Sequence, residues 1–485
     1  MASNDDETPM LGACAICEKS ASLRCAGCRK RFYCSKEHQR GDWARHKLAC
    51  RSWEIRENEE LGRHLIASRD LETGDFIVAE TPIVWGPAPH GDSIVCVGCG
   101  DSKVRVRCPG CNWYACRVSC DGLVDENRHG IECAFLTKSG MIPRCDILLV
   151  LRILILRRRN PKLWAILGAL QSHEESRGVG TEAYEETELV ARQIDAVLAM
   201  DPSSREILPK ICGLIDVNAL ETNPPEGCAA LYETACLLEH NCVANTRHSF
   251  SIDAQGRPKI TVTAATSIKK GEHLSTMYTH ALWSTRSRRE HLMVTKYFSC
   301  RCDRCTDPTE LGSHLGTLKC LCGSGLVLPN NPLDNETEWT CTVCPGSLTA
   351  SEVAQLTDRL ADDVDAAMGM ARKDSLSDLL SRLSVLLHPG HQHCTAVGHS
   401  LMQLLSPEDP KKAQICRQII ETTSILDPYG IRLCLYTAVA LRELASCPGQ
   451  DRKALLERAR SLLSHEPPNT PGQEVLRLVQ NELTN

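Results

Sequence analysis

Cysteine and histidine side chains recur in the first third of the chain at spacings suited to binding metal ions. One group of eight consists of Cys14, Cys17, Cys25, Cys28, Cys34, His38, His46 and Cys50. A second group consists of Cys96, Cys99, Cys108, Cys111, Cys116, Cys120, His129 and Cys133. Corresponding members lie 82 or 83 residues apart, so the chain repeats one module. A structural zinc ion takes four ligands of these types, and each module therefore predicts a finger that holds two ions.

The chain contains 29 cysteines, which indicates either a disulfide-linked secreted protein or a reduced zinc protein. The segment from Met1 to Met10 is acidic and lacks the basic start and apolar run of a secretory signal. The longest apolar stretch, Ile147 to Leu156, is interrupted by Arg152 and is shorter than the ~20 residues of a membrane span. A reducing compartment with zinc is the better interpretation. The alternative, buried core thiols, requires no fixed Cys-x2-Cys spacing.

Two more cysteine groups follow in the second half of the chain. Cys300, Cys302 and Cys305 supply only three ligands, so a fourth must come from elsewhere in the fold. The other group resembles a zinc ribbon and consists of Cys320, Cys322, Cys341 and Cys344. Its first pair is Cys-x-Cys in place of the usual Cys-x2-Cys. We expect one zinc ion in each group.

Composition limits the classes of protein to consider. At 485 residues the chain is too long for a single hydrophobic core, so several domains are expected. Charged residues make up 24% of the chain and the formal net charge is −6. This balance argues against extensive disorder and against binding nucleic acid through charged tails. No recognition helix is evident, so direct DNA binding by the fingers is not expected.

The elements that position the cysteine groups follow from hydrophobic spacing. The segments Phe76–Ala79 and Ile83–Trp85 are rich in β-forming residues and are separated by Pro82. Helical apolar spacing is found at 147–156, 163–170 and 188–200. A strand-rich region is expected from about 229 to 280. From 350 to 485 the pattern predicts successive amphipathic helices, interrupted by proline and glycine pairs.

Four short motifs resemble those of SET-domain methyltransferases. They are Leu61-Gly-Arg-His-Leu65 with the segment that follows it, Glu239-His-Asn-Cys-Val-Ala-Asn245, Gly271-Glu-His-Leu-Ser-Thr-Met-Tyr278, and Phe298-x-Cys300. The second cysteine–histidine module lies after the first SET strands, where the SET- and MYND-domain (Smyd) protein methyltransferases carry a MYND finger. The chain is identified as a member of this family over essentially its whole length. The additional N-terminal finger resembles the arthropod-type subgroup.

The resemblance implies how the zinc ligands combine, because MYND fingers bind their two ions in an interleaved pattern. The implied sets of the first finger are Cys14, Cys17, Cys34 and His38, and Cys25, Cys28, His46 and Cys50. Those of the second finger are Cys96, Cys99, Cys116 and Cys120, and Cys108, Cys111, His129 and Cys133. Cys242 is implied as the fourth ligand beside Cys300, Cys302 and Cys305. With the ribbon, about six zinc ions are expected.

The resemblance also implies a cofactor, S-adenosylmethionine, and transfer of its methyl group to a lysine amine. The residues implied to bind the cofactor are Gly62, Arg63, His64, Asn218, Glu239, His240, Tyr278 and Phe298. Tyr278 is also implied as the catalytic residue, whose hydroxyl orients the amine. Expected partners are protein substrates and proline-rich or corepressor-type proteins bound by the fingers. A monomer in the cytoplasm or nucleus is expected, without direct nucleic-acid or membrane binding.

Two positions depart from the family pattern. His64 stands where the family usually has a glycine, and a histidine there is strained or blocks the cofactor pocket if the position requires a positive φ. Glu239 replaces an asparagine, and its carboxylate can pair with the ammonium group of the cofactor but repels its carboxylate. Two functions therefore stay open. One is a protein-lysine methyltransferase, which Tyr278 and Phe298 favour. The other is an inactive adaptor that acts as a transcriptional corepressor scaffold.

The expected fold is α+β and multidomain, with a β-rich SET domain and an all-α, TPR-like C-terminal domain. The expected divisions are an N-terminal MYND finger (10–51), the first part of the SET domain (52–95), the inserted MYND finger (96–133), a helical SET insertion (134–210), the SET core (211–281), the post-SET zinc site (282–312), the zinc ribbon (315–346) and the C-terminal helical domain (347–485).

Overall fold

The computed structural model describes residues 12–25, 28, 31–89, 94–139, 145–198, 200–464, 466 and 470–484. The chain forms two compact units. Unit 1 comprises residues 1–239 and 245–275, and unit 2 comprises residues 240–244 and 276–485. The chain passes from one unit to the other within two short strands, β13 (Glu239–His240) and β16 (Ser275–Thr276), and again after Ala244.

The N-terminal finger is built from two small hairpins and one helix. Its elements are β1 (Gly12–Ala13), β2 (Ser20–Ala21), β3 (Leu23–Arg24), β4 (Phe32–Tyr33) and α1 (Lys36–Cys50). Ser35 caps α1 by accepting a hydrogen bond from the backbone N–H of His38. The buried cluster of the finger consists of Tyr33 and three cysteines. Apolar burial alone therefore contributes little to the stability of this finger.

Antiparallel sheets form the strand-rich part of unit 1. A hairpin joins β5 (Trp53–Asn58) to β6 (Gly62–Ala67), and Gly62 adopts a φ of 62° at its turn. One three-stranded sheet has the order β14 (Thr246–Ile252), β15 (Pro258–Ala264) and β7 (Phe76–Glu80). Another has the order β11 (Leu220–Thr222), β12 (Cys228–Leu231) and β8 (Val84–Pro87). The strands predicted around residues 76–85 are thus confirmed as β7 and β8.

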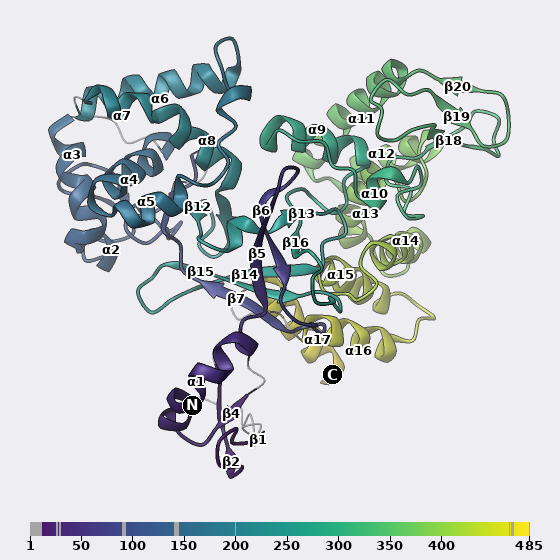
Figure 1. Cartoon of the computed structure of the whole chain (residues 1–485). Helices are drawn as coiled ribbons and strands as arrows, with labels where there is room; N and C mark the ends of the chain where they lie inside the picture. The colour runs from purple at the N-terminus through teal and green to yellow at the C-terminus, as the bar shows by residue number, and fades with distance from the viewer. Residues whose placement is uncertain are drawn as a thin grey trace. The chain divides into compact units, whose positions relative to one another are not determined.

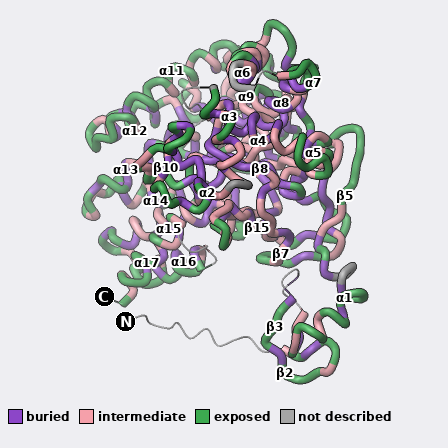
Figure 2. The backbone as a smooth tube through the Cα atoms, turned by 90° about the vertical axis from the view of Figure 1, so that its left-hand side faces the viewer, coloured by how far each residue is buried: buried purple, intermediate pink, exposed green. Residues whose placement is uncertain are grey.

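The second finger and the helices that follow it complete unit 1. The finger contains β9 (Val106–Arg107), β10 (Tyr114–Ala115), α2 (Asp121–Val124), the π-helix η1 (Glu126–Gly130) and α3 (Ile131–Ser139). After it come α4 (Cys145–Arg159), α5 (Pro161–Leu167), η2 (Glu174–Ser176), α6 (Glu182–Leu198), α7 (Pro202–Glu206), α8 (Leu208–Asn218) and, later, η3 (Ala235–Leu237). Helix α4 is the central one, because it contacts β8, α5, α6 and α8, and its residues from Ile147 to Leu151 are buried (Figure 2).

Unit 2 begins with the helices around the post-SET cysteines and continues into a ribbon and a helical array. The first elements are α9 (Thr285–Lys296) and α10 (Asp303–Thr306), followed by a four-stranded antiparallel ribbon of β17 (Leu318–Lys319), β18 (Leu326–Pro329), β19 (Trp339–Cys341) and β20 (Ser347–Leu348). The array consists of α11 (Ala350–Met370), α12 (Lys373–Leu386), α13 (Gln392–Leu404), α14 (Pro410–Leu426), α15 (Cys434–Ala445), α16 (Arg452–Leu463) and α17 (Pro471–Thr484). Consecutive helices pack against each other, green to yellow in Figure 1.

The α+β fold class and the helical C-terminal region predicted from the sequence are confirmed. Helices α11, α13, α14 and α16 of the array each begin at an N-cap side chain that accepts a backbone hydrogen bond. At α11, for example, the Thr349 and Glu352 side chains each bond the backbone N–H of the other residue in a capping box. Within the described residues, every helix is too short or too polar to cross a lipid bilayer.

Candidate functional site

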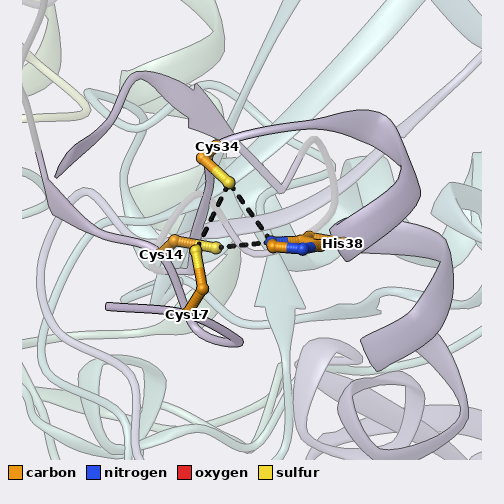
Figure 3. Close-up of side chains that lie close together, drawn as sticks. All are labelled: Cys14, Cys17, Cys34 and His38. Carbon is orange, nitrogen blue, oxygen red and sulfur yellow. Dashed lines mark hydrogen bonds between the residues drawn. The ribbon is translucent and has the colours of Figure 1, made fainter. Parts of the chain in front are cut away.

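The first implied zinc set of the N-terminal finger comes together at the end of the hairpins and the start of α1. Figure 3 shows the Cys14, Cys17 and Cys34 thiols pointing toward the ring of His38. The Nδ1 atom of His38 lies 3.3 Å from the Cys14 Sγ and 3.2 Å from the Cys34 Sγ, and the Sγ atoms of Cys17 and Cys34 are 3.5 Å apart. The Ser35 cap starts α1 at a point that directs His38 into this set.

The second set of this finger is fully buried and uses the other end of α1. His46 and Cys50 are four residues apart, so they lie on one face of the helix. The Nε2 atom of His46 is 3.3 Å from the Cys28 Sγ, and the Sγ atoms of Cys25 and Cys50 are 3.5 Å apart. The Nδ1 atom of His46 is buried and has no hydrogen-bond partner among the described residues.

The inserted finger repeats both sets in unit 1. Sγ atoms are 3.9 Å apart for Cys96 and Cys120 and 3.6 Å apart for Cys99 and Cys116. In the other set, the Nε2 atom of His129 is 3.3 Å from the Cys111 Sγ, and the Sγ atoms of Cys108 and Cys133 are 3.6 Å apart. The ligand atoms of each set in both fingers lie within 4.8 Å of one another.

His129 differs from His46 because a buried carboxylate orients its ring. Its Nδ1–H donates to the Glu132 Oε1 over 2.8 Å, which leaves Nε2 to face the cysteines. Arg152 on α4 donates to both oxygens of Glu132 over 2.7 Å. Although burial alone raises it, the pKa of Glu132 lies below its usual value because Arg152 and His129 flank the carboxyl group. A carboxylate behind a metal-binding histidine fixes the ring and strengthens the ligand.

A third kind of cluster lies in unit 2, where Cys242 joins the three post-SET cysteines. Cys242 is far from them in the sequence, yet its Sγ lies 3.9 Å from that of Cys300 and 3.6 Å from that of Cys305. With Cys302, the four thiols lie within 4.8 Å of one another. The short helix α10 starts after Cys302 and turns Cys305 back toward the group.

Two buried arginines and one glutamate support this cysteine cluster. Arg288 is completely buried, and it donates from Nε to the Cys242 Sγ over 3.1 Å and from Nη1 to Glu310 over 2.7 Å. Arg304 donates to the same carboxylate oxygen of Glu310 over 3.2 Å. Although burial opposes it, Glu310 and the cysteines hold the pKa of Arg288 above its usual value. The guanidinium thus places positive charge beside thiols that carry negative charge when they bind zinc.

The ribbon brings its four cysteines together at the turns of its hairpins, where Cys322 is exposed and the other three are partly buried. The Sγ atoms of Cys320 and Cys344 are 3.6 Å apart, and those of Cys322 and Cys341 are 3.9 Å apart. All these cysteine separations fit tetrahedral zinc, because Zn–S bonds of about 2.3 Å place two thiolate sulfurs about 3.8 Å apart. The donor types are also those zinc prefers. The residues present therefore fit zinc in the fingers, the post-SET cluster and the ribbon.

Within unit 2, His240 links the candidate catalytic tyrosine to the cysteine cluster. Its Nδ1 accepts the backbone N–H of Tyr278 over 3.0 Å, so the ring proton lies on Nε2, 3.3 Å from the Cys242 Sγ. Burial, with smaller contributions from Arg288 and Arg304, lowers the pKa of His240 to about 4 and keeps the ring neutral. The rings of Tyr278 and Phe298 lie 5.3 and 5.8 Å from that of His240.

The other implied cofactor residues belong to unit 1. Arg63 donates to the carbonyl oxygen of Ala169 over 2.7 Å, and the amide of Asn218 donates to the carbonyl oxygens of Gln171 and Leu214. These bonds tie β6 and α8 to the segment that joins α5 to η2. Gly62 is the residue with the left-handed backbone in this segment of β6.

The backbone of His64 is not strained. His64 lies within β6, and its φ is not among the positive values that mark left-handed residues. Its side chain is 3% exposed, donates from Nδ1 to the carbonyl oxygen of Gly62 and stacks on His273, with ring centroids 4.6 Å apart. His273 in turn bonds Glu239. Sequence reasoning missed His273, Arg152, Arg288 and Glu310, because their roles depend on contacts between distant segments. It also missed Glu132, whose spacing of three residues from His129 is a local signal that could have identified it.

Comparison with known proteins adds to these observations. Residues 14–50 match the MYND finger family. The chain is 29% identical over 334 residues to SET domain-containing protein SmydA-8, isoform B, of Drosophila melanogaster, which is 63% of this chain and 70% of that protein. It is 26% identical over 276 residues to histone-lysine N-methyltransferase Smyd1 of Mus musculus, which is 52% of this chain and 55% of that protein. A crystal structure of the SET domain of LSMT bound to lysine and AdoHcy aligns with 91% of both chains, at 12% identity and a TM-score of 0.34.

Proposed function

We propose that this SET and MYND protein transfers the methyl group of S-adenosylmethionine to lysine side chains of protein substrates. The observation that carries the proposal is the hydrogen bond from the Tyr278 backbone to His240, which is itself directed at Cys242. This bond ties the position of the tyrosine to a cysteine cluster that zinc makes rigid. A relative named as a histone-lysine N-methyltransferase supports the same reaction class.

Positioning is the main task of the protein in such a reaction. When bound, S-adenosylmethionine would supply a sulfonium methyl group whose carbon a neutral amine attacks directly, with the sulfur leaving as a neutral thioether. The Tyr278 hydroxyl holds the lysine nitrogen in line, since alignment of the two reactants supplies much of the acceleration. Free lysine has a pKa of about 10.4, so its amine must lose a proton first. Half-buried Tyr278 and Phe298 surround it with little water, which favours the neutral amine.

The residues that would hold the cofactor are those named from the sequence: Gly62, Arg63, His64, Asn218, Glu239, His240, Tyr278 and Phe298. Phe298 offers an aromatic face, and the neutral ring of His240 adds no positive charge beside a sulfonium. Glu239 is paired with His273, which offsets the negative charge that would repel the carboxylate of the cofactor.

We assign structural zinc, about six ions in all, to the fingers, the post-SET cluster and the ribbon. MYND fingers mediate protein interactions, and we propose that these two recruit proline-rich or corepressor-type partners of a monomeric enzyme. We propose chromatin proteins as one class of substrate for this enzyme. We also propose that the enzyme is located in the nucleus, the cytoplasm or both.

Calorimetry with the zinc-loaded protein and S-adenosylmethionine tests the proposal. We expect saturable binding, and we expect Tyr278→Phe to bind the cofactor with nearly unchanged affinity while methyl transfer to a lysine peptide falls by at least a hundredfold. Absence of binding at millimolar cofactor would overturn the proposal and favour a non-catalytic adaptor. Unchanged turnover in Tyr278→Phe would mean that another residue orients the amine.

A further inference from the structure

A cavity of about 540 Å³ lies within unit 2, outside the residues assigned to zinc or to the cofactor. Its walls come from the N-terminal half of α9, the loop between β18 and β19 of the ribbon, one face of α11 and the start of α13. A volume of this size is typical of a ligand site. The ribbon therefore has a role beyond holding its own zinc ion, since it supplies one wall.

The face of α11 that lines the cavity is a continuous stripe. Its residues recur at helical spacing and are Ala350, Val353, Ala354, Thr357, Asp358 and Ala361. From the first to the last, the stripe is about 16 Å long. About five residues of extended polypeptide span that distance at ~3.3 Å per residue. The shape thus suits an extended segment of a protein.

The charge of the cavity is negative. Six carboxylates line it, against two guanidinium groups, and one of the six, buried Glu310, is already neutralised by Arg288 and Arg304. Arg286 is fully engaged, because it bonds Glu290, Thr357 and Asp358. Asp334 and Glu336 on the ribbon loop are exposed, and no positively charged side chain pairs with them among the described residues. A segment with positive charges complements this rim.

The inner surface offers apolar contact. Trp339, Pro329 and Pro332 line it from the ribbon side. Arg289 is 8% exposed, and its Nη1 donates to the carbonyl oxygen of Pro332 over 2.7 Å. This bond joins α9 to the ribbon loop that forms the opposite wall.

We propose that this cavity binds a lysine- and arginine-rich extended segment of a protein substrate, away from the lysine that is methylated. The inference rests on the proposed function for its choice of partner. The aliphatic stems of lysine and arginine would lie against Trp339 and the prolines, with the charged ends at Asp334, Glu336 and Asp358. Helix α9 connects the cavity with the catalytic elements of unit 2, because it presents Arg286 and Arg289 to the cavity and Arg288 to Cys242.

Fluorescence anisotropy with a labelled nonapeptide of alternating arginine and alanine tests the proposal. Arginine replaces lysine so that the probe cannot itself accept a methyl group. We expect it to bind the full-length, zinc-loaded protein at least tenfold more tightly than a nonapeptide of alternating glutamate and alanine. In Glu336→Gln/Asp358→Asn, which changes the ribbon wall and the α11 wall together, affinity for the arginine probe should fall about five- to tenfold and become less sensitive to salt.

The matched control is Glu408→Gln/Glu421→Gln, which removes two exposed carboxylates of unit 2 that do not line the cavity. This variant should bind the probe within about twofold of the parent protein. Equal affinity for both peptides, or an equal effect of the two double variants, would overturn the proposal.

The same preparations, titrated with S-adenosylmethionine, separate this inference from the proposed function. Cofactor binding without selective binding of the arginine probe refutes the substrate cavity alone. Selective probe binding without cofactor binding refutes the methyltransferase and leaves the cavity as a site for basic protein segments.

Discussion

His273 donates a hydrogen bond from Nδ1 to the Glu239 carboxylate over 2.8 Å. The ring of His64 stacks on His273 at an interplanar angle of 20°. His64 and Glu239 are the two positions expected to depart from the family pattern, and His273 contacts both of them. The two positions are therefore linked through one imidazole within unit 1. The Glu239 carboxylate is paired with that imidazole.

This pairing predicts that His273→Glu alone does more harm than His273→Glu combined with Glu239→Asn. His273→Glu sets two carboxylates against each other and should weaken S-adenosylmethionine binding about five- to tenfold, given that like charges about 4 Å apart repel by about 1 kcal/mol in water-like surroundings. His273→Glu combined with Glu239→Asn leaves a single carboxylate in the pair and should recover the affinity. Calorimetry of the two single variants and the double variant measures the coupling.

A control for this cycle is Lys270→Glu, an exposed charge change in the same turn. It should alter cofactor affinity by less than twofold. If the effects of His273→Glu and Glu239→Asn simply add, the two residues are not coupled and the compensation does not operate.

The sequence predicted the zinc sets more completely than their surroundings. Finger ligands come from short segments whose spacing is visible in the sequence, so the eight candidates of each finger could be named, and the resemblance to MYND fingers implied how they divide into sets of four. Cys242 is 58 residues from Cys300 and could be named only through the resemblance to a family. The pair of Glu132 and Arg152 is separated by 20 residues, and the pair of Arg288 and Glu310 by 22. No local sequence pattern predicts ion pairs at such separations. The helices, like the finger ligands, could be predicted because their apolar residues recur within short segments of the sequence.

The buried chain from His129 through Glu132 to Arg152 predicts a difference between the two fingers. Glu132→Gln removes the charge behind His129 and leaves Arg152 without a carboxylate, so zinc affinity at this set should fall about ten- to a hundredfold. Hydrogen exchange during titration with a chelator measures the loss finger by finger. Amides of residues 106–133 should exchange at lower chelator concentration than in the parent protein.

Asp121→Asn is the control for Glu132→Gln, because it removes an exposed carboxylate from the same finger. It should leave the chelator midpoint unchanged. The N-terminal finger provides an internal reference, since His46 has no carboxylate behind it among the described residues and Glu132→Gln does not touch it. Equal midpoints for Glu132→Gln and the parent protein would show that Glu132 does not strengthen zinc binding.

Arg288 should be essential to the stability of unit 2. Arg288→Met keeps the length of the side chain but removes the charge beside Cys242 and one partner of buried Glu310. Breaking a buried pair on one side costs about 3–5 kcal/mol. Arg286→Met on the same helix removes only partly exposed pairs and should cost about 1 kcal/mol or less. Urea unfolding and zinc content of both variants provide the comparison, and similar losses for the two would contradict a special role for Arg288.

Buried histidines near the start of α13 should make unit 2 sensitive to acid. Burial, with smaller contributions from His393 and His388, holds the pKa of His391 well below its usual 6.5. Burial also lowers the pKa of His388 to about 4 and that of His393. Since the unfolded chain takes up protons near pH 6.5 and the folded chain does not, the stability is complete above pH 6.5 and is lost as the pH falls below it.

His391→Asn tests this dependence on a single residue. The Nδ1 of His391 accepts the backbone N–H of His393, and the amide oxygen of asparagine can accept the same bond at this helix cap. The parent protein should therefore lose about 1 kcal/mol more than the variant between pH 7.5 and pH 5.5, in urea unfolding of zinc-loaded samples followed by tryptophan fluorescence. Any loss of zinc at the lower pH is common to both proteins, so the difference between them isolates the histidine. Parallel curves would mean that His391 takes up its proton within the folded state, despite its burial.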